Sequence, residues 1–431
     1  MIFRFKTFFL QIFFSLVSTL IIGTPYFPLK NTILFNKKKF LYNFFKLHDS
    51  IQRPFWWYIR SNVSNTLNAK FNFTVRVLLS EAGDETETVW QIISEAGFLV
   101  TADSFVQEKM TSQQTLTIRL KKEILVLNNK KVNAKWMTFT PRRNSVLFIN
   151  GKTYPGSCAI VWYNDAWLLI NLVDFEEYIY YVLRSESWPG WPIEVNKVFA
   201  IASRSYVVAK ICESYKKKCP YHIKDNNHHQ TYNLYGMDEN INIRRATQET
   251  RGIILVYNNQ PALTMFDACC GGVIPAEVDH VDFKKAPYLA RSYACDFCRM
   301  CKLYAWEHVY NLDEILDILQ AKGIPIRDCN WIKVQKADKT GIVEEVIFGN
   351  KKEKHILTGN QCYTSIAKIK SFCFSISKKG RMVYISGFGF GHHVGLCQWG
   401  AKSMVDQGWD YASILHYYYP GTCLKKLYRY T

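Results

Sequence analysis

Short segments with the period of β-strands dominate residues 73–172. Segments 74–79 and 115–120 alternate apolar or β-branched residues with polar ones, and 167–171 is a short apolar run. The run at 145–149 leads into Asn150-Gly151, a dipeptide typical of two-residue hairpin turns. The pattern therefore predicts that this part of the chain is mainly β.

After residue 174 the spacing of apolar residues becomes helical. It predicts helices at 175–183 and 193–212, separated by a break at 185–192 that is rich in proline and tryptophan. Further elements are predicted as helices at 312–321 and 401–418 and as strands at 253–257, 262–266, 341–348 and 382–386, the first two strands forming a hairpin. The fold class is thus α+β, and we expect the mixed strands and helices to form a substrate groove.

The N-terminus has the layout of an export signal. Arg4 and Lys6 precede an apolar run at 8–22, which is shorter than the roughly 20 residues of a comfortable membrane span. A cleaved signal and a retained anchor both fit residues 1–24, and a buried core helix is a third interpretation. Residues 25–72 are predicted to be a spacer that either touches the membrane surface or is a solvated loop. Residues 73–431 are predicted to form the folded domain.

Composition narrows the choice of partner. The 431 residues include 54 Lys and Arg against 36 Asp and Glu, a net charge of +18, which favours an anionic partner. Export to a periplasm or cell envelope, with an inner-membrane anchor, argues against nucleic acid and for wall glycan and anionic lipid. A cytosolic nucleic-acid binder stabilised by zinc is the competing hypothesis, and the apolar N-terminal run argues against it.

The break at 185–192 carries the candidate catalytic group. Glu186 stands close to Trp188 and Trp191. Apolar surroundings raise the pKa of a carboxyl group, which suits a general acid, and tryptophan faces pack against sugar rings. Lys197 and Arg204 are two helical turns apart and share a face, where they can position an anionic group. The alternatives are a capping or solvated glutamate beside core tryptophans, and a solvated basic stripe.

Four ordered blocks resemble the SpoIID/LytB family of cell-wall proteins. Residues 177–206 resemble E-Y-L-x-G-V-V-x-S-E-M followed by W-P-x-E-A-L-K-A-Q-A-V-A-A-R-T-Y, and His229-Gln230-Thr231-Tyr232 resembles H-Q-V-Y. Gly271-Gly272 matches the family's S-G-G. Residues 387–401 resemble G-R-G-x-G-H-G-V-G-L-S-Q-W-G-A. The resemblance covers about residues 73–431.

The resemblance implies a lytic transglycosylase that cleaves peptidoglycan strands without stem peptides, in wall remodelling or division. The family's catalytic acid falls on Glu186, which would form 1,6-anhydro-muramic acid ends without a cofactor. The substrate-binding candidates are Lys197, Arg204, His229, Gln230, Tyr232, Trp188, Trp191, His392 and Gln398. The alternative is a non-catalytic glycan binder that enhances a cell-wall amidase.

Several positions depart from the family pattern. Asp267 stands where a histidine is frequent, and His393 and Cys397 replace glycine and serine. Some members bind zinc through a cysteine and a histidine near H-Q-V-Y, but Lys224 occupies the cysteine position here, so that site is in doubt.

A different metal site is the candidate. Its four predicted ligands, which suit a tetrahedral structural zinc, are Cys270, Cys295, Cys298 and Cys301. In an exported protein, disulfides are the competing interpretation, and unpaired core thiols are a third.

Overall fold

The computed structural model describes residues 73–427 except 84–85, 104–107, 111–113, 143–144, 189, 226–229, 233–239, 277–280 and 327–328. All described residues belong to one compact unit. The predicted signal or anchor and the spacer lie outside them. No helix among the described residues is long and apolar enough to cross a membrane.

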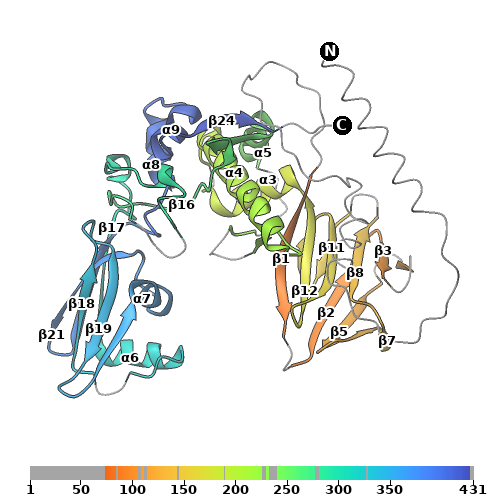
Figure 1. The fold of residues 1–431 in the computed structure, drawn as a ribbon, viewed down its shortest axis with the longest axis horizontal. Coiled ribbons are helices and arrows are strands. Elements are labelled where there is room, and N and C mark those ends of the chain that lie inside the picture. The colour runs from red at the N-terminus through yellow and green to blue at the C-terminus, as the bar shows by residue number, and fades with distance from the viewer. Residues whose placement is uncertain are drawn as a thin grey trace, which may run out of the picture. The chain divides into compact units, whose positions relative to one another are not determined.

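Residues 73–174 build two sheets, as the strand pattern predicts (Figure 1). The first has the order β13-β1-β12-β11-β8-β3-β4, with β1 (Thr74–Ala82), β3 (Phe98–Ala102), β4 (Glu108–Met110), β8 (Trp136–Pro141), β11 (Ser157–Tyr163), β12 (Ala166–Asp174) and the later β13 (Ile223–Lys224). The second has the order β10-β9-β2-β5-β6-β7, with β2 (Thr88–Ile93), β5 (Leu116–Lys121), β6 (Ile124–Leu127), β7 (Lys130–Val132), β9 (Leu147–Ile149) and β10 (Lys152–Tyr154).

The two sheets bury side chains in one shared hydrophobic cluster. In β5, buried and partly exposed residues alternate, as expected for a strand with one face on the core. The predicted turn at Asn150-Gly151 is confirmed: it joins β9 to β10, and both residues have the positive φ that this turn type requires.

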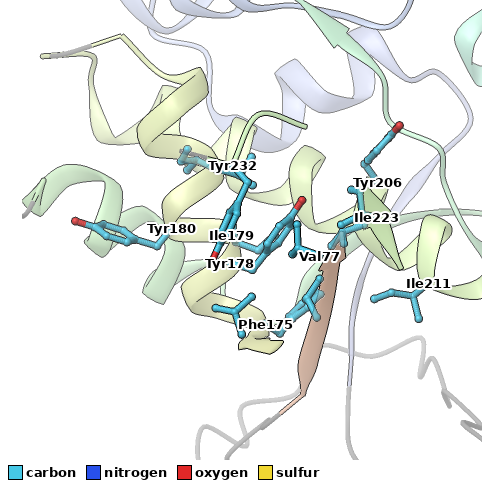
Figure 2. Packing of buried hydrophobic residues seen from close by; sticks show 14 of the residues in the cluster. Val77, Phe175, Tyr178, Ile179, Tyr180, Tyr206, Ile211, Ile223 and Tyr232 are labelled. Atoms are coloured by element: carbon cyan, nitrogen blue, oxygen red, sulfur yellow. The ribbon is translucent and has the colours of Figure 1, made fainter. Parts of the chain in front are cut away.

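Three helices follow the sheets. They are α3 (Phe175–Glu186), α4 (Ile193–Lys217) and α5 (Ile241–Glu249). The side chain of Asp174 caps α3 by accepting hydrogen bonds from the backbone N–H groups of Glu176 and Glu177. Figure 2 shows how Phe175 and Tyr178 of α3 and Ile211 of α4 gather in the core with Val77 of β1. Both predicted helices are confirmed, and each extends past its predicted end.

The C-terminal part returns to the same hydrophobic cluster. It contains β14 (Ile253–Tyr257), β15 (Gln260–Pro261), β16 (Phe266–Asp267), β23 (Leu396–Cys397), α8 (Gln398–Asp406), α9 (Tyr411–Tyr418) and β24 (Cys423–Lys426), together with the short helices η1 (Pro287–Leu289) and η2 (Asp296–Cys298). The predicted strand at 262–266 is wrong, because the hairpin partner ends at Pro261. The predicted helix at 401–418 is two helices, which break near Gly408, a residue with φ of 87°.

Residues 305–388 form a second hydrophobic cluster of their own. It lies between two three-stranded sheets and two helices, made of β17 (Ala305–Asn311), α6 (Leu312–Ala321), β18 (Trp331–Ala337), β19 (Val343–Gly349), β20 (Lys354–Thr358), α7 (Gly359–Ser365), β21 (Cys373–Lys379) and β22 (Met382–Phe388). The predicted helix at 312–321 is confirmed residue for residue. The α+β class is confirmed as well, whereas the substrate groove stays a prediction.

Candidate active site

Glu186 is the last residue of α3, at the point where the chain leaves the helix. Ser187 follows in extended conformation, and its backbone N–H donates to the carbonyl of Leu183. The side chain of Ser187 donates to Oδ1 of Asn196, 2.7 Å away on α4. Asn196 in turn donates to the carbonyls of Trp191 and Pro192 at 3.3 and 3.2 Å. These bonds fix the break that carries Glu186.

The carboxyl group of Glu186 is partly buried and is held from one side. Its Oε1 accepts a hydrogen bond of 3.1 Å from the backbone N–H of Thr231, and the Thr231 hydroxyl also bonds to the carboxyl group. Burial raises the pKa of Glu186 above its usual value, and the two bonds from Thr231 oppose that shift. A carboxyl group with a raised pKa fits the role of a general acid.

Three tryptophans pack together beside Glu186. The Trp188 ring lies 6.4 Å from that of Trp191 and 5.6 Å from that of Trp399, measured between ring centroids. Trp188 is 47% exposed, whereas Trp191 is only 7% exposed. Of the two predicted sugar platforms, therefore, Trp188 presents a free surface and Trp191 supports it from the core.

Gln230 and Tyr232 are buried, unlike side chains that meet a substrate. Gln230 accepts a bond of 3.0 Å from the Tyr178 hydroxyl and donates to the carbonyl of Ser203. Tyr232 stacks on Tyr178 at 5.3 Å, and its hydroxyl donates to Oδ1 of Asn171 at 2.9 Å. The two residues flank Thr231 and hold it against Glu186. They position the site, which corrects their prediction as substrate contacts; His229 lies outside the described residues.

The glycine-rich block brings Gln398 to the same place. Gln398, the first residue of α8, donates from Nε2 to the backbone carbonyl of Glu186 at 3.4 Å. The imidazole of His392 accepts a bond of 3.1 Å from the N–H of Val394, and burial lowers the pKa of His392 to about 4. His392 is therefore neutral near pH 7.

His393 occupies a position that the family pattern gives to glycine. Its φ is 64°, the left-handed region, and its N–H donates to Oδ2 of Asp267 at 2.7 Å. Its ring also bonds to the carbonyl of Cys270 and to the N–H of Cys373. Side-chain bonds on both ring nitrogens offset the strain of a non-glycine residue here.

Arg204 does not face a substrate. Its side chain is fully buried and forms a two-pronged ion pair with Glu176, with distances of 2.9 and 3.3 Å. It also donates to the carbonyls of Ala200 and Ile253. The predicted role in binding is wrong for Arg204, because every direction around the guanidinium is occupied by protein.

Lys197 is also held by acidic side chains of the protein. Its Nζ lies 3.2 Å from Glu194 and 3.0 Å from Glu249, at the end of α5. The predicted shared face of Lys197 and Arg204 exists, but on it each cation has a carboxylate partner. Neither carboxylate is Glu186.

The four cysteines that lie together in the structure differ by one residue from the predicted metal ligands. The sulfur atoms of Cys270, Cys295, Cys298 and Cys397 lie within 4.8 Å of one another, and all four residues are buried. Cys397 thus takes the place predicted for Cys301. None of the 13 cysteines, all of which the structure describes, is in a disulfide.

The structure adds three functional candidates that the sequence did not predict. Thr231 binds the Glu186 carboxyl group, Trp399 packs on Trp188, and Cys397 joins the sulfur cluster. Thr231 and Trp399 are each adjacent to a predicted site residue. Cys397 stands where the family pattern has serine. All three lie inside the motif blocks at 229–232 and 387–401, so membership of a block is the signal that points to them.

A family model described as SpoIID, Stage II sporulation protein, matches residues 163–257, which contain α3, Glu186 and Thr231. An uncharacterized protein of Brachyspira hyodysenteriae is 30% identical over 276 residues, which cover 63% of this chain and 72% of that protein. The chain belongs to the SpoIID/LytB family of cell-wall proteins, as its motif blocks predict.

Two named relatives come from Bacillus subtilis. Its stage II sporulation protein D is 24% identical over 274 residues, covering 60% of this chain and 77% of the relative. Its amidase enhancer is 24% identical over 296 residues, covering 56% of this chain but only 39% of the enhancer.

Proposed function

We propose that this protein is a peptidoglycan lytic transglycosylase with Glu186 as its catalytic acid and base. The observation that carries the proposal is the state of the Glu186 carboxyl group. Burial raises its pKa, while Thr231 holds Oε1 from one side. A group that is protonated more easily than usual, yet stabilised when ionised, suits a residue that gives up a proton and takes one back.

The reaction needs only one such carboxyl group. Glu186 donates its proton to the glycosidic oxygen that leaves C1 of N-acetylmuramic acid. The C6 hydroxyl of the same sugar then attacks C1, and the Glu186 carboxylate accepts the hydroxyl proton. One C–O bond breaks, one forms, and Glu186 ends protonated as it began. Because no water is activated, the second carboxylate of a hydrolase is unnecessary.

The surroundings of Glu186 support a glycan as the substrate. Trp188 stands two residues away and exposes about half of its surface, which suits stacking against a sugar ring. The chain's net charge of +18 favours a strand whose muramic acids carry carboxylates. We infer that the protein acts on wall glycan in the cell envelope.

The second candidate function is that of a glycan-binding partner of a cell-wall amidase. The similarity to a protein named amidase enhancer favours it. Asp267, where a histidine is frequent in the family pattern, favours it too. Both functions use the Trp188 surface, but only the enzyme requires the Glu186 proton.

The test is digestion of peptide-free glycan strands, with mass analysis of the products. The Glu186→Gln variant keeps an oxygen that accepts the Thr231 bond, so it removes the proton with little change in shape. Glu177→Gln is the matched control, because Glu177 is on the same helix but pairs with Arg244. Wild type and the control should release 1,6-anhydro ends, and Glu186→Gln should not. Glycan binding without cleavage by all three proteins would support the amidase partner instead.

A further inference from the structure

Four thiols from three separate segments converge in the core. Cys270 follows β16, and Cys397 is the N-cap residue of α8. Cys295 is the N-cap residue of the short helix η2, and Cys298 is its last residue. Their sulfur atoms lie within 4.8 Å of one another, and that of Cys270 is 3.7 Å from that of Cys298. All four side chains are buried.

We propose that Cys270, Cys295, Cys298 and Cys397 bind one structural Zn²⁺ ion. Four thiolates at about 2.3 Å from a zinc ion form a tetrahedron whose sulfurs are separated by about 3.8 Å. The observed spacing therefore fits a single ion. Four protein ligands leave no open position for water or substrate, so the ion stabilises the fold and does not take part in the chemistry.

The hydrogen bonds around the cluster favour thiolates. The sulfur of Cys397 accepts bonds of 3.3 Å from the backbone N–H groups of Cys270 and Gly400. One of these donors belongs to the first turn of α8, where the helix dipole favours negative charge. Backbone N–H bonds to the ligand sulfurs are the outer shell that a zinc–thiolate site requires.

A buried cation, Arg291, interacts electrostatically with Cys270 and Cys295. Zinc with four thiolates carries a net charge of −2, which is costly to bury alone. The guanidinium of Arg291, itself buried, lies 5.9 Å from the ring centre of Tyr418. The Tyr418 hydroxyl is 3.1 Å from the sulfur of Cys295. Tyr418 therefore contacts the cluster directly, and the positive charge of Arg291 lies beside its ring.

Gly400 is closely packed against Tyr418 and the sulfur of Cys295. A side-chain carbon at Gly400 would stand 2.1 Å from the Tyr418 hydroxyl and 2.9 Å from the sulfur of Cys295. Only glycine fits between the helix and the cluster. Such packing matches a preformed site that is closed on all sides.

Disulfides fit the cluster less well than a metal. A disulfide requires two sulfurs at about 2.05 Å, and no pair among the 13 described cysteines is bonded. The sulfur of Cys301 instead accepts a bond of 3.3 Å from the N–H of Leu303, outside the set of four. Cys301 is therefore the matched control for Cys397.

The site has a consequence for Glu186. Cys397 immediately precedes Gln398, which donates to the Glu186 carbonyl, and Leu396 and Cys397 pair with β16 next to Cys270. The ion would join these segments at the base of the active site. Zinc binding by the four cysteines does not depend on the glycan chemistry, so each can be tested without the other.

The experiment measures metal content and thiol state of the full chain, purified with and without reductant. We expect one zinc per chain, and cobalt exchange should give the thiolate-to-metal absorption of a four-sulfur site. Cys301→Ser should keep the zinc, and Cys397→Ser should lose most of it. Zinc retained by Cys397→Ser would overturn the assignment. A metal-free wild type, bound iron in place of zinc, or disulfides among the four cysteines would also overturn it, whether or not the variants fold.

Discussion

The backbone N–H of Thr231 donates to Oε1 of Glu186 at 3.1 Å, across 45 residues of sequence. This bond joins the H-Q-T-Y segment to the end of α3. Because it comes from the backbone, it survives any change of the Thr231 side chain. The hydroxyl of Thr231 adds a second bond to the same carboxyl group. The two contributions can therefore be separated by mutation.

Thr231→Val should shift the pH dependence of glycan cleavage upward. The hydroxyl bond lowers the pKa of Glu186, so its loss raises the pKa further. Because Glu186 must be protonated to donate, the decline of activity on the alkaline side moves to higher pH. Profiles of the cleavage rate against pH measure this, with Thr231→Ser as the variant that keeps the hydroxyl. A decline that moves to lower pH would contradict the role of Thr231.

Glu186→Gln should stabilise the fold at neutral pH. Burial raises the pKa of Glu186 in the folded state, so the ionised group is less favourable there than in the unfolded chain. Wild type thus loses stability as the pH rises from the unfolded value of about 4.3 through the raised folded pKa. Thermal unfolding of both proteins between pH 4 and 8 should show the variant gaining on wild type as the pH increases. A wild type that is more stable than Glu186→Gln near neutral pH would contradict a raised pKa of Glu186 in the folded protein.

Arg204→Met should destabilise the protein strongly. It leaves the Glu176 carboxylate buried without its cation, which costs about 3–5 kcal/mol. The control is Arg245→Met, which breaks an exposed pair with Glu249 and should cost less than about 1 kcal/mol. Urea unfolding measures both. Equal and small losses would mean that the buried pair of Arg204 and Glu176 does not stabilise the core.

Trp188→Ala and Trp191→Ala should separate binding from stability. Loss of the half-exposed Trp188 surface should weaken glycan binding about tenfold, or about 1.4 kcal/mol, with little effect on unfolding. Loss of the buried Trp191 should cost about 3–5 kcal/mol of stability. Pull-down with glycan strands and urea unfolding check the two outcomes. Unchanged binding by Trp188→Ala would remove Trp188 from the substrate surface.

Local pattern predicted most elements because their periods are strong. The helix at 312–321 and the turn at Asn150-Gly151 follow from spacing and turn chemistry alone. The single helix predicted at 401–418 failed, because Gly408 ends α8 with a positive φ that apolar spacing does not reveal. The separate hydrophobic cluster of residues 305–388 depends on contacts between distant strands, which no local pattern reports.

In the candidate active site and the sulfur cluster, too, local motifs were predictable and contacts between distant residues were not. Glu186 was predictable from its motif, but the partner of Arg204 was not, since Glu176 lies 28 residues away. Cys397 entered the sulfur cluster for the same reason: it is 99 residues from Cys298, and only the pairing of β16 with β23 brings it there. Sequence spacing favoured Cys301 because it is near in the chain.

In the proposed mechanism, Glu186 directs an attack by the sugar's own hydroxyl and not by water. Cleavage of peptide-free glycan in water labelled with heavy oxygen tests this directly, with the new chain ends read by mass spectrometry. We expect anhydro ends that carry no labelled oxygen in wild type, and no new ends in Glu186→Gln. New reducing ends that contain the label, or equal cleavage by Glu186→Gln, would contradict it.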